Sequence, residues 1–488
     1  MSSTGRLVIV SNRVGDPRKA SAGGLAVALG DALAKSGGLW FGWSGKVVDD
    51  GAPGEGEVHH QRSGTVELVT IDLSKADHDT YYAGYSNQAL WPAFHYRLDL
   101  ADFASGFFAG YQRVNRLFAR KLAVLLRPDD VIWVHDYHLI PLADELRALG
   151  CRQRIGFFLH IPLPPPPILA AIPGHKWLMR SFFAYDLVGL QTRSDADHFA
   201  RFVQEEAGAR ALGEGRFEAL GRQVVARAYP IGIDVEEFQR LASSNDSRQT
   251  EAMLKKQYSH RRLLVGIDRL DYSKGLPQRF RAFRELLANY PENLNSATLI
   301  QIASPTRESV QAYEELRREL EGLAGEINGD YGELDWLPIR YLHRVWARRR
   351  LPALYRASRV ALVTPLRDGM NLVAKEYVAM QVEADPGVLV LSRFAGAAEQ
   401  MPEALLVNPY DIPATTQAIQ RALSMSLVER QERHSALLAQ IREHDVHDWS
   451  RTFLDALSAI ETRPPEAIAS LVLQRAAPVS DDKPDLIT

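Results

Sequence analysis

Two cations, Arg269 and Lys274, lie five residues apart in the segment GIDRLDYSKGLPQRF (residues 266–280). The segment follows an apolar run and leads through Gly275 into a helical pattern. A helix N-terminus presents unpaired backbone N–H groups, and two cations beside it suit a diphosphate. Charged runs are usually only solvated surface, but the flanking strand and the glycine–helix start favour a binding role here.

A second segment, LVTPLRDGMNLVAKE (residues 362–376), has the same strand–turn–helix pattern and adds two carboxylates. Gly369 supplies the turn, and Met370 to Glu376 read as the beginning of a helix. Carboxylates such as Asp368 and Glu376 do not bind phosphate, but they do bind sugar hydroxyls. The segment therefore indicates a ligand that is part phosphate and part polyol, such as a nucleotide-sugar.

A third segment, SNRVGDPRKASAGGLAVAL (residues 11–29), places Gly23 and Gly24 before an expected helix at residues 25–34. Glycines at a helix start let a ligand approach the backbone. A tight turn explains them equally well, and the segment matches neither the dinucleotide nor the P-loop pattern. Arg13, just past the end of a strand, is a candidate phosphate ligand because its guanidinium is a forked donor.

Polar residues follow two further apolar runs. His135, Asp136 and His138 come after residues 131–134, and His160 ends the run 155–159. The carboxyl ends of parallel strands face the ligand crevice of an open sheet. A metal site is the alternative for the first group, but no further ligand cluster accompanies it. We therefore expect Asp136 to accept a hydroxyl, and His160 to be either a core histidine or a ligand contact.

The remaining candidates are one cation and a set of aromatic residues. Arg307 follows another apolar run and is a candidate phosphate clamp. Tyr82 and Trp91, like Trp40 and Trp43, are placed by the sequence in polar, glycine-containing loops, where their rings would stack on sugars. Ordinary core packing is the alternative for each of these aromatic side chains.

Short apolar runs that alternate with helical patterns must position these residues. Such runs suit strands covered on both faces, and their alternation with helices predicts parallel α/β sheets. The nine runs are residues 7–10, 131–134, 155–159, 187–190, 263–267, 299–303, 360–363, 388–391 and 405–407. The polar stretch 242–260 precedes a new first strand, so we place a domain junction near residues 234–240.

Composition excludes several classes of protein. The 488 residues carry a formal net charge of −3, which gives no general attraction to nucleic acid or to an anionic membrane. Cys151 is the only cysteine, so no intrachain disulfide forms and a reducing compartment fits. No apolar run approaches membrane-spanning length, and the first residues lead directly into a strand without a signal-peptide pattern. We expect a cytoplasmic protein.

Taken together, these segments resemble the trehalose-6-phosphate synthase family. The matching strings run in family order from residue 7 to about residue 456: SNR, SAGGLAVAL, GGLWFGWSG, LWPAFHYRLDL, HDYHL, GFFLHIP, YPIGI, RLDYSKGLP, TPLRDGMNLVAKEYV, PGVLVLS, FAGAAEQ and NPYD. The resemblance implies two Rossmann-like domains whose parallel sheets face each other across a cleft, the GT-B arrangement. It divides the chain into an acceptor domain (1–236), a nucleotide-sugar donor domain (237–446), a helix crossing back to the first domain (447–462) and a tail (463–488).

The resemblance also implies a reaction and a role for each candidate. Glucose would pass from a nucleotide diphosphate-glucose, with UDP-glucose expected, to glucose 6-phosphate, with retention and with neither metal nor cofactor. The catalytic residues would be Arg269, Lys274, His160 and Asp136. The donor site would comprise Gly23, Gly24, Arg269, Lys274, Trp346, Asp368, Met370, Asn371, Leu372, Val373 and Glu376. The acceptor site would comprise Arg13, Tyr82, Trp91, Asp136 and Arg307.

Trp346 departs from the family pattern, where another aromatic residue is usual, so the choice of base stays open. Two rival functions also stay open: a pseudo-glycosyltransferase that joins a nucleotide-cyclitol to an amino-cyclitol phosphate, and a non-catalytic sugar-phosphate sensor. We expect small molecules as the substrates, no nucleic-acid or membrane partner, and assembly into a homo-oligomer, either a dimer or a tetramer.

Overall fold

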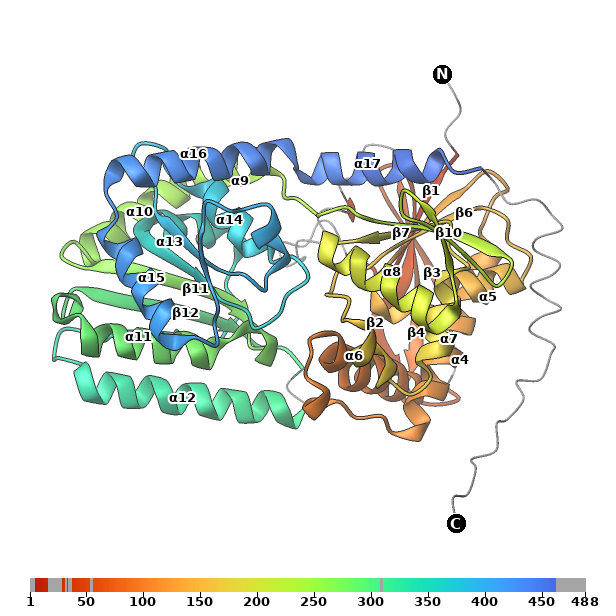
Figure 1. Cartoon of the computed structure of the whole chain (residues 1–488), viewed down its shortest axis with the longest axis horizontal. Helices are drawn as coiled ribbons and strands as arrows, with labels where there is room; N and C mark the ends of the chain where they lie inside the picture. The colour runs from red at the N-terminus through yellow and green to blue at the C-terminus, as the bar shows by residue number, and fades with distance from the viewer. Residues whose placement is uncertain are drawn as a thin grey trace, which may run out of the picture.

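Each of the nine apolar runs coincides with a strand in the computed structural model of the chain, which describes residues 5–15, 29–30, 33, 37–52, 56–307 and 310–461. The strands form two separate sheets, one from the first half of the chain and one from the second. Figure 1 shows the two sheets with their helices side by side along the long axis of the molecule.

The first sheet has ten strands in the order β3-β4-β2-β1-β5-β6-β7-β10-β9-β8. Its strands are β1 (Leu7–Arg13), β2 (Gly38–Val48), β3 (Val58–Ser63), β4 (Val66–Ser74), β5 (Val131–His135), β6 (Arg154–Phe158), β7 (Leu187–Leu190), β8 (Arg210–Gly213), β9 (Arg216–Ala219) and β10 (Arg222–Ala228). The central strands pair in parallel, whereas β3, β8 and β9 pair antiparallel at the two edges.

The second sheet has six strands, all parallel, in the order β13-β12-β11-β14-β15-β16. Its strands are β11 (Arg262–Arg269), β12 (Ala297–Ser304), β13 (Ile339–Leu342), β14 (Ser358–Val363), β15 (Val388–Ser392) and β16 (Leu405–Val407). This is the doubly wound order of the Rossmann fold, in which the order of the strands reverses between the first strand, β11, and the fourth, β14.

Helices cover both faces of each sheet. Those of the first half are α2 (Lys75–Asp77), η1 (His78–Leu90, a π-helix), α3 (Trp91–Phe94), η2 (Leu98–Leu100), α4 (Ser105–Ala123), η3 (Tyr137–Leu139), α5 (Leu142–Ala148), α6 (Pro166–Ala170), α7 (His175–Phe182) and α8 (Arg193–Ala207). Those of the second half are α9 (Val235–Ala242), α10 (Asn245–Gln257), η4 (Tyr272–Lys274), α11 (Leu276–Asn289), η5 (Pro291–Asn293), α12 (Gln311–Tyr331), η6 (Arg348–Arg350), α13 (Leu351–Ala357), α14 (Leu372–Met380), η7 (Gly396–Glu399), α15 (Ile412–Ser424), α16 (Leu427–Glu443) and α17 (Val446–Ser458).

The last helix, α17, crosses back to the first sheet, as Figure 1 shows along the upper edge of the molecule. Its Phe453 ring stacks on Trp133 of β5, with ring centroids 4.8 Å apart at an interplanar angle of 13°. A methyl group built on Gly156 or on Gly189 would lie 2.8 Å or less from that phenyl ring or from Phe158. Glycine in β6 and β7 therefore creates the space into which the helix fits.

The aromatic segments are not loops, and that sequence prediction was wrong. Trp40 and Trp43 lie in β2, Tyr82 lies in η1, and Trp91 begins α3. Glycine in β2 is compatible with a strand because its neighbours approach closely: a methyl group on Gly42 would lie 2.2 Å from the Ser11 carbonyl oxygen of β1. Within the described residues, no helix combines the length and apolar character needed to cross a membrane.

Candidate active site

The candidate residues gather where both sheets reverse their strand order. In the first sheet this point lies between β1 and β5, which end next to Arg13 and Asp136. In the second it lies between β11 and β14, whose ends lead to the Arg269–Lys274 loop and to Asp368. Ligands of doubly wound sheets bind outside the carboxyl ends of the strands at this switch point. Topology thus pairs the segments within each sheet, and contacts between the two domains, such as those of Arg269 and Arg307 with Trp91, bring the two pairs together.

The amine of Lys274 and the carboxylate of Asp368 form an ion pair, with Nζ and Oδ2 2.5 Å apart. Asn371 donates from Nδ2 to the same Oδ2 atom at 3.0 Å. Burial alone would raise the pKa of Asp368, but the Lys274 charge and hydrogen bond outweigh it and hold the pKa below its usual value. A cation and an ionised hydroxyl acceptor therefore lie side by side.

Arg269 and Arg307 of the second domain both lie over one aromatic ring of the first domain, that of Trp91. Their guanidinium carbons lie 5.1 Å and 3.9 Å from the centroid of the Trp91 ring. Arg307 also donates from Nη2 to the Tyr137 hydroxyl at 3.3 Å. A buried carboxylate of the second domain, Asp271, lies 3.8 Å from Arg269 and 3.6 Å from Arg307. The expected donor and acceptor cations are therefore neighbours.

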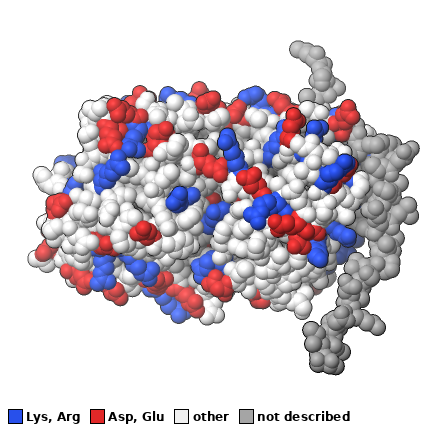
Figure 2. Space-filling model, in the orientation of Figure 1, with Lys and Arg blue, Asp and Glu red and all other residues white. Residues whose placement is uncertain are grey.

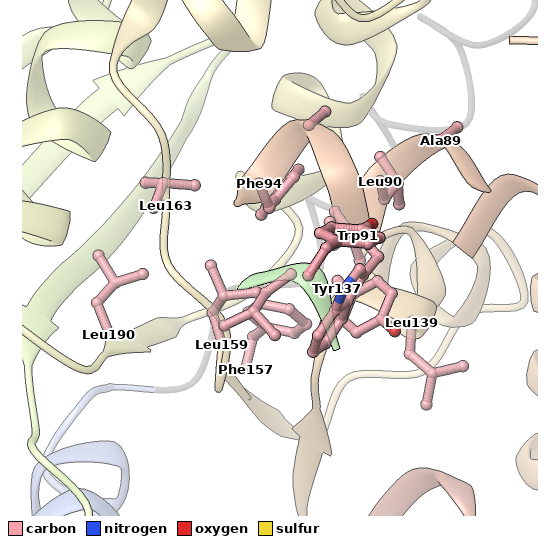
Figure 3. Close-up of a cluster of buried hydrophobic side chains, with 14 of the residues drawn as sticks. Ala89, Leu90, Trp91, Phe94, Tyr137, Leu139, Phe157, Leu159, Leu163 and Leu190 are labelled. Atoms are coloured by element: carbon pink, nitrogen blue, oxygen red, sulfur yellow. The ribbon is translucent and has the colours of Figure 1, made fainter. Parts of the chain in front are cut away.

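An aromatic wall connects the two arginines of the expected acceptor site. Arg13 lies 5.8 Å from the centroid of the Trp43 ring, and Trp43 contacts Tyr82 at 5.4 Å between centroids. Beyond Tyr82, rings of the η3 turn continue the wall to Trp91. Figure 3 shows Trp91 packed over Tyr137, a contact of 5.8 Å between centroids, among buried apolar side chains. The rings thus both fill the core and border the site.

Asp136 occupies a conformation that few non-glycine residues adopt, with φ 75°. Such a backbone costs free energy and is found preferentially at functional sites. Its carboxylate accepts the His160 backbone N–H at 3.2 Å. Burial raises the pKa of Asp136 to about 6, although backbone hydrogen bonds and Arg269 oppose that shift. A desolvated carboxylate held by rigid backbone suits a fixed contact to a hydroxyl group.

His160 has its ring turned into the first domain and its carbonyl toward the second. Gln191 accepts the Ile231 N–H with Oε1, so its Nε2 donates to His160 Nδ1 at 3.5 Å, and His160 Nε2 then donates to His135 Nδ1 at 3.1 Å. Burial lowers the pKa of His160 to about 3, so the ring is neutral. The ring nitrogens therefore face protein groups, and the carbonyl oxygen is the part that faces the loop between β14 and α14.

Gly369, in the loop between β14 and α14, lies directly against that carbonyl oxygen. A methyl group at Gly369 would lie 2.2 Å from the His160 carbonyl oxygen, and one at Gly396 would lie 1.9 Å from the Gly369 carbonyl oxygen. Neither position tolerates a side chain without a shift of backbone. Nearby, Glu399 accepts the Arg193 N–H at the start of α8, at 3.0 Å, so a carboxylate of the second domain lies at a helix N-terminus of the first.

The start of α14 lines the expected nucleotide pocket. Met370 is buried, whereas Leu372 and Val373 are partly buried against the same apolar cluster as Trp346. Glu376 lies one turn further along α14, where burial raises its pKa to about 7 against the opposing charge of Arg348. The helix thus presents backbone, apolar surface and one carboxylate to the same side.

Gly23 and Gly24 lie outside the described residues, so their predicted donor contacts stay predictions. Sequence reasoning also missed Asp271. It named His95 only as part of the aromatic segment, and His95 is buried and packs against Trp91 with centroids 4.1 Å apart. The signal for Asp271 was present, because it stands between the two cations directly after β11. Within the part of the chain described, no three His, Cys, Asp or Glu residues gather as a metal-ion site.

Two doubly wound domains that bring cations and hydroxyl acceptors together at facing switch points define a GT-B glycosyltransferase, as expected. The chain belongs to glycosyltransferase family 20, whose family model matches residues 9–459. The resemblance to the trehalose-6-phosphate synthases is thereby confirmed.

Individual relatives agree with this assignment. A trehalose-6-phosphate synthase from Klebsiella pneumoniae is 48% identical over 464 residues, covering 95% of this chain and 97% of the relative. A crystal structure of a UDP-forming alpha,alpha-trehalose-phosphate synthase from Burkholderia xenovorans, in complex with glucose-6-phosphate, has a TM-score of 0.89 at 48% identity and covers 93% of this chain and 100% of that one. A solved structure from E. coli, bound with UDP-2-fluoro glucose, has a TM-score of 0.89 at 46% identity and covers 94% of this chain and 100% of that one.

Proposed function

We propose that this chain transfers glucose from UDP-glucose to glucose 6-phosphate, forming α,α-trehalose 6-phosphate and UDP with retention at the donor carbon. The proposal is supported by family membership and by the ligands named for two relatives, glucose-6-phosphate and UDP-2-fluoro glucose. It assigns trehalose biosynthesis to the chain.

The observation that carries the proposal is the approach of both Arg269 and Arg307 to the Trp91 ring. A transferase that joins two phosphate-bearing substrates needs two cationic anchors whose separation matches the substrates in contact. Here one anchor, Arg269, ends β11, and the other, Arg307, follows β12. The first domain supplies the aromatic floor through Trp91. A site for one phosphate alone would not need both arginines.

The donor half follows from the ion pair at its centre. Lys274 and Arg269 would neutralise the diphosphate as charge develops on the leaving group, which is electrostatic stabilisation of the oxyanion-hole kind. Asp368 would hold glucose hydroxyls, and the backbone of Met370, Asn371, Leu372 and Val373 would meet sugar and phosphates. Trp346 would line the base and Glu376 would bind the ribose.

The acceptor half lies over the aromatic wall. Arg13 and Arg307 would bind the phosphate of glucose 6-phosphate, Tyr82 and Trp91 would border its sugar, and Asp136 would accept one of its hydroxyls. The acceptor hydroxyl would attack from the side on which UDP leaves, and the leaving phosphate would take its proton. The His160 carbonyl, held against Gly369, would lie beside the reacting carbon. No carboxylate nucleophile is invoked, unlike in retaining glycosidases.

The functional division of the chain is part of the proposal. Residues 1–236 would form the acceptor domain and residues 237–446 the donor domain, and the helix within 447–462 would join them. The two sheets, which end at β10 and begin at β11, are compatible with that division.

One assay tests the proposal. Purified protein is incubated with glucose 6-phosphate and, in parallel, UDP-, GDP- or ADP-glucose, and the product is identified by NMR, whose anomeric couplings report the configuration. We expect α,α-trehalose 6-phosphate, formed fastest from UDP-glucose. If no donor yields trehalose 6-phosphate, the proposal is refuted, and the cyclitol transferase and the sensor become the leading alternatives. If turnover is faster with GDP- or ADP-glucose, the assigned base is refuted.

A further inference from the structure

We propose that Asp271 is a positioning residue that aims the donor arginine and the acceptor arginine at the same time. The inference rests on the proposed function, in which Arg269 binds the leaving diphosphate and Arg307 the acceptor phosphate. It adds a third member to that pair, a carboxylate that touches neither substrate and acts through the two guanidinium groups.

The geometry singles out one oxygen of Asp271. Its Oδ2 lies 3.8 Å from Arg269 Nη2 and 3.6 Å from Arg307 Nη1. The same oxygen accepts the Tyr313 hydroxyl at 3.4 Å, and that hydroxyl accepts from Arg307 Nη1 at 2.7 Å. The arginines come from the ends of neighbouring strands, β11 and β12, so a single carboxylate bridges the two loops.

The other oxygen of Asp271 fixes the carboxylate to the backbone. Oδ1 accepts the Ser273 N–H at 3.0 Å, and the Asp271 carbonyl accepts the Lys274 N–H at 3.0 Å, which together close the η4 turn. The residue is fully buried, whereas the Arg269 side chain is 44% exposed. Arg269 is therefore the more open of the two arginines to substrate, Arg307 is 10% exposed, and the carboxylate stays behind both on rigid backbone.

The charges of the neighbouring cations give the carboxylate a second role. Two guanidinium groups lie over the Trp91 ring, and with Lys274 nearby they would repel one another without an intervening anion. Burial alone would raise the pKa of Asp271, yet the charges of Arg269, Arg307 and Lys274 hold it well below its usual range. The carboxylate is therefore ionised at every pH at which the protein would be assayed, and it opposes the repulsion permanently.

The consequence separates binding from turnover. Asparagine at position 271 has nearly the same shape and can still accept the Ser273 N–H, but it lacks the charge that holds both arginines in place. The cations themselves remain, so each phosphate should still bind. A misplacement of about 1 Å at a reacting centre costs about 100-fold in rate, because transition-state contacts depend on alignment. Turnover should therefore suffer far more than affinity.

The test compares Asp271→Asn with Asp186→Asn. Asp186 is a buried carboxylate 2.9 Å from Arg147. It directly precedes β7 and so lies at the amino ends of the strands of the first sheet, whereas the candidate site lies at their carboxyl ends. Its substitution therefore removes an ion pair remote from the site. For each variant, the kcat for trehalose 6-phosphate and the dissociation constants of UDP and glucose 6-phosphate are measured. We expect Asp271→Asn to lower kcat about 100-fold while both dissociation constants change less than about tenfold. Asp186→Asn should lower Tm and leave kcat unchanged.

Two results would overturn the inference. One is a folded Asp271→Asn variant whose kcat stays within threefold of wild type, and the other is a loss of affinity for both ligands as large as the loss of kcat. If Asp271→Asn fails to fold, Tyr313→Phe keeps the carboxylate and removes only the bridging hydroxyl. It should lower kcat about tenfold without changing the dissociation constant of UDP, and an unchanged kcat there would equally refute the inference.

The wild-type reaction distinguishes failure of the proposed function from failure of the role assigned to Asp271. Absence of trehalose 6-phosphate from the wild-type reaction refutes the proposed function and this inference with it. Normal wild-type product together with unimpaired Asp271→Asn turnover refutes only the role of Asp271.

Discussion

Replacing Lys274 by alanine is the most direct perturbation of the donor site. Its amine lies 2.5 Å from Asp368 Oδ2, and the two side chains are 11% and 14% exposed. At an effective dielectric constant of about 20, a unit charge about 3 Å from a leaving phosphate oxygen contributes about 5 kcal/mol. Removal of single transition-state donors in other enzymes costs about 3–4 kcal/mol, so we expect kcat to fall about 100- to 1,000-fold.

The variant should also shift the pH dependence of the reaction. In the wild type, Lys274 holds the pKa of Asp368 below its ordinary value against the effect of burial. Without the lysine, burial dominates, the pKa of Asp368 rises, and the acid limb of the kcat profile moves to higher pH.

The assay is release of UDP at saturating UDP-glucose and glucose 6-phosphate, with circular dichroism to confirm the fold. Arg269→Ala should show a loss of the same order. Arg284→Ala provides a control, since it breaks an exposed pair with Asp330 in the same domain and should leave turnover unchanged. Turnover of Lys274→Ala within tenfold of wild type would refute the electrostatic role.

Three further predictions follow from buried groups. Asp136→Asn should lower kcat/KM for glucose 6-phosphate about 10- to 100-fold and remove the wild-type decline below pH 6, because the pKa of Asp136 is about 6 and only its carboxylate accepts the hydroxyl. Glu376 has its pKa raised from 4.5 to about 7, so its ionisation destabilises the fold as pH rises through that interval; Glu376→Gln should raise Tm at pH 8 while it raises KM for UDP-glucose, and a lower Tm would contradict this. Phe453→Ala should cost about 3–5 kcal/mol of unfolding free energy, measured by denaturant titration, because it empties the contact with Trp133; a loss below about 1 kcal/mol would refute that packing.

The sequence predicted the nine strands that read as short apolar runs, but it missed β4, which is largely buried although polar residues interrupt its pattern. It failed where a strand reads otherwise. β2 has glycine and tryptophan that serve close strand contacts, β3 is polar and exposed, and β13 (IRYL) contains an arginine and is buried only at Ile339. In these strands, tertiary contacts rather than local pattern decide the structure.

The site could be predicted to the level of its segments but not of its contacts. Arg269, Lys274 and Asp368 were identifiable because each follows a strand at a turn, which is a local property. That Arg307 shares Trp91 with Arg269 depends on how the two domains meet. That the His160 ring faces His135, and that Asp271 joins Arg269 to Arg307, depends on side-chain contacts between neighbouring strands of one sheet. Local pattern contains no information about either kind of contact.

The crossing of α17 has a consequence for synthesis of the chain on the ribosome. Phe158 and the glycine-lined faces of β6 and β7 are covered by Phe453, which is translated 295 residues after Phe158. At about 5–20 residues per second, that interval lasts about 15–60 s. Throughout it, the first domain presents an uncovered aromatic surface that only the end of the same polypeptide fills. A chain released before α17 would keep that apolar surface exposed, and exposed apolar surface makes incomplete chains prone to aggregation.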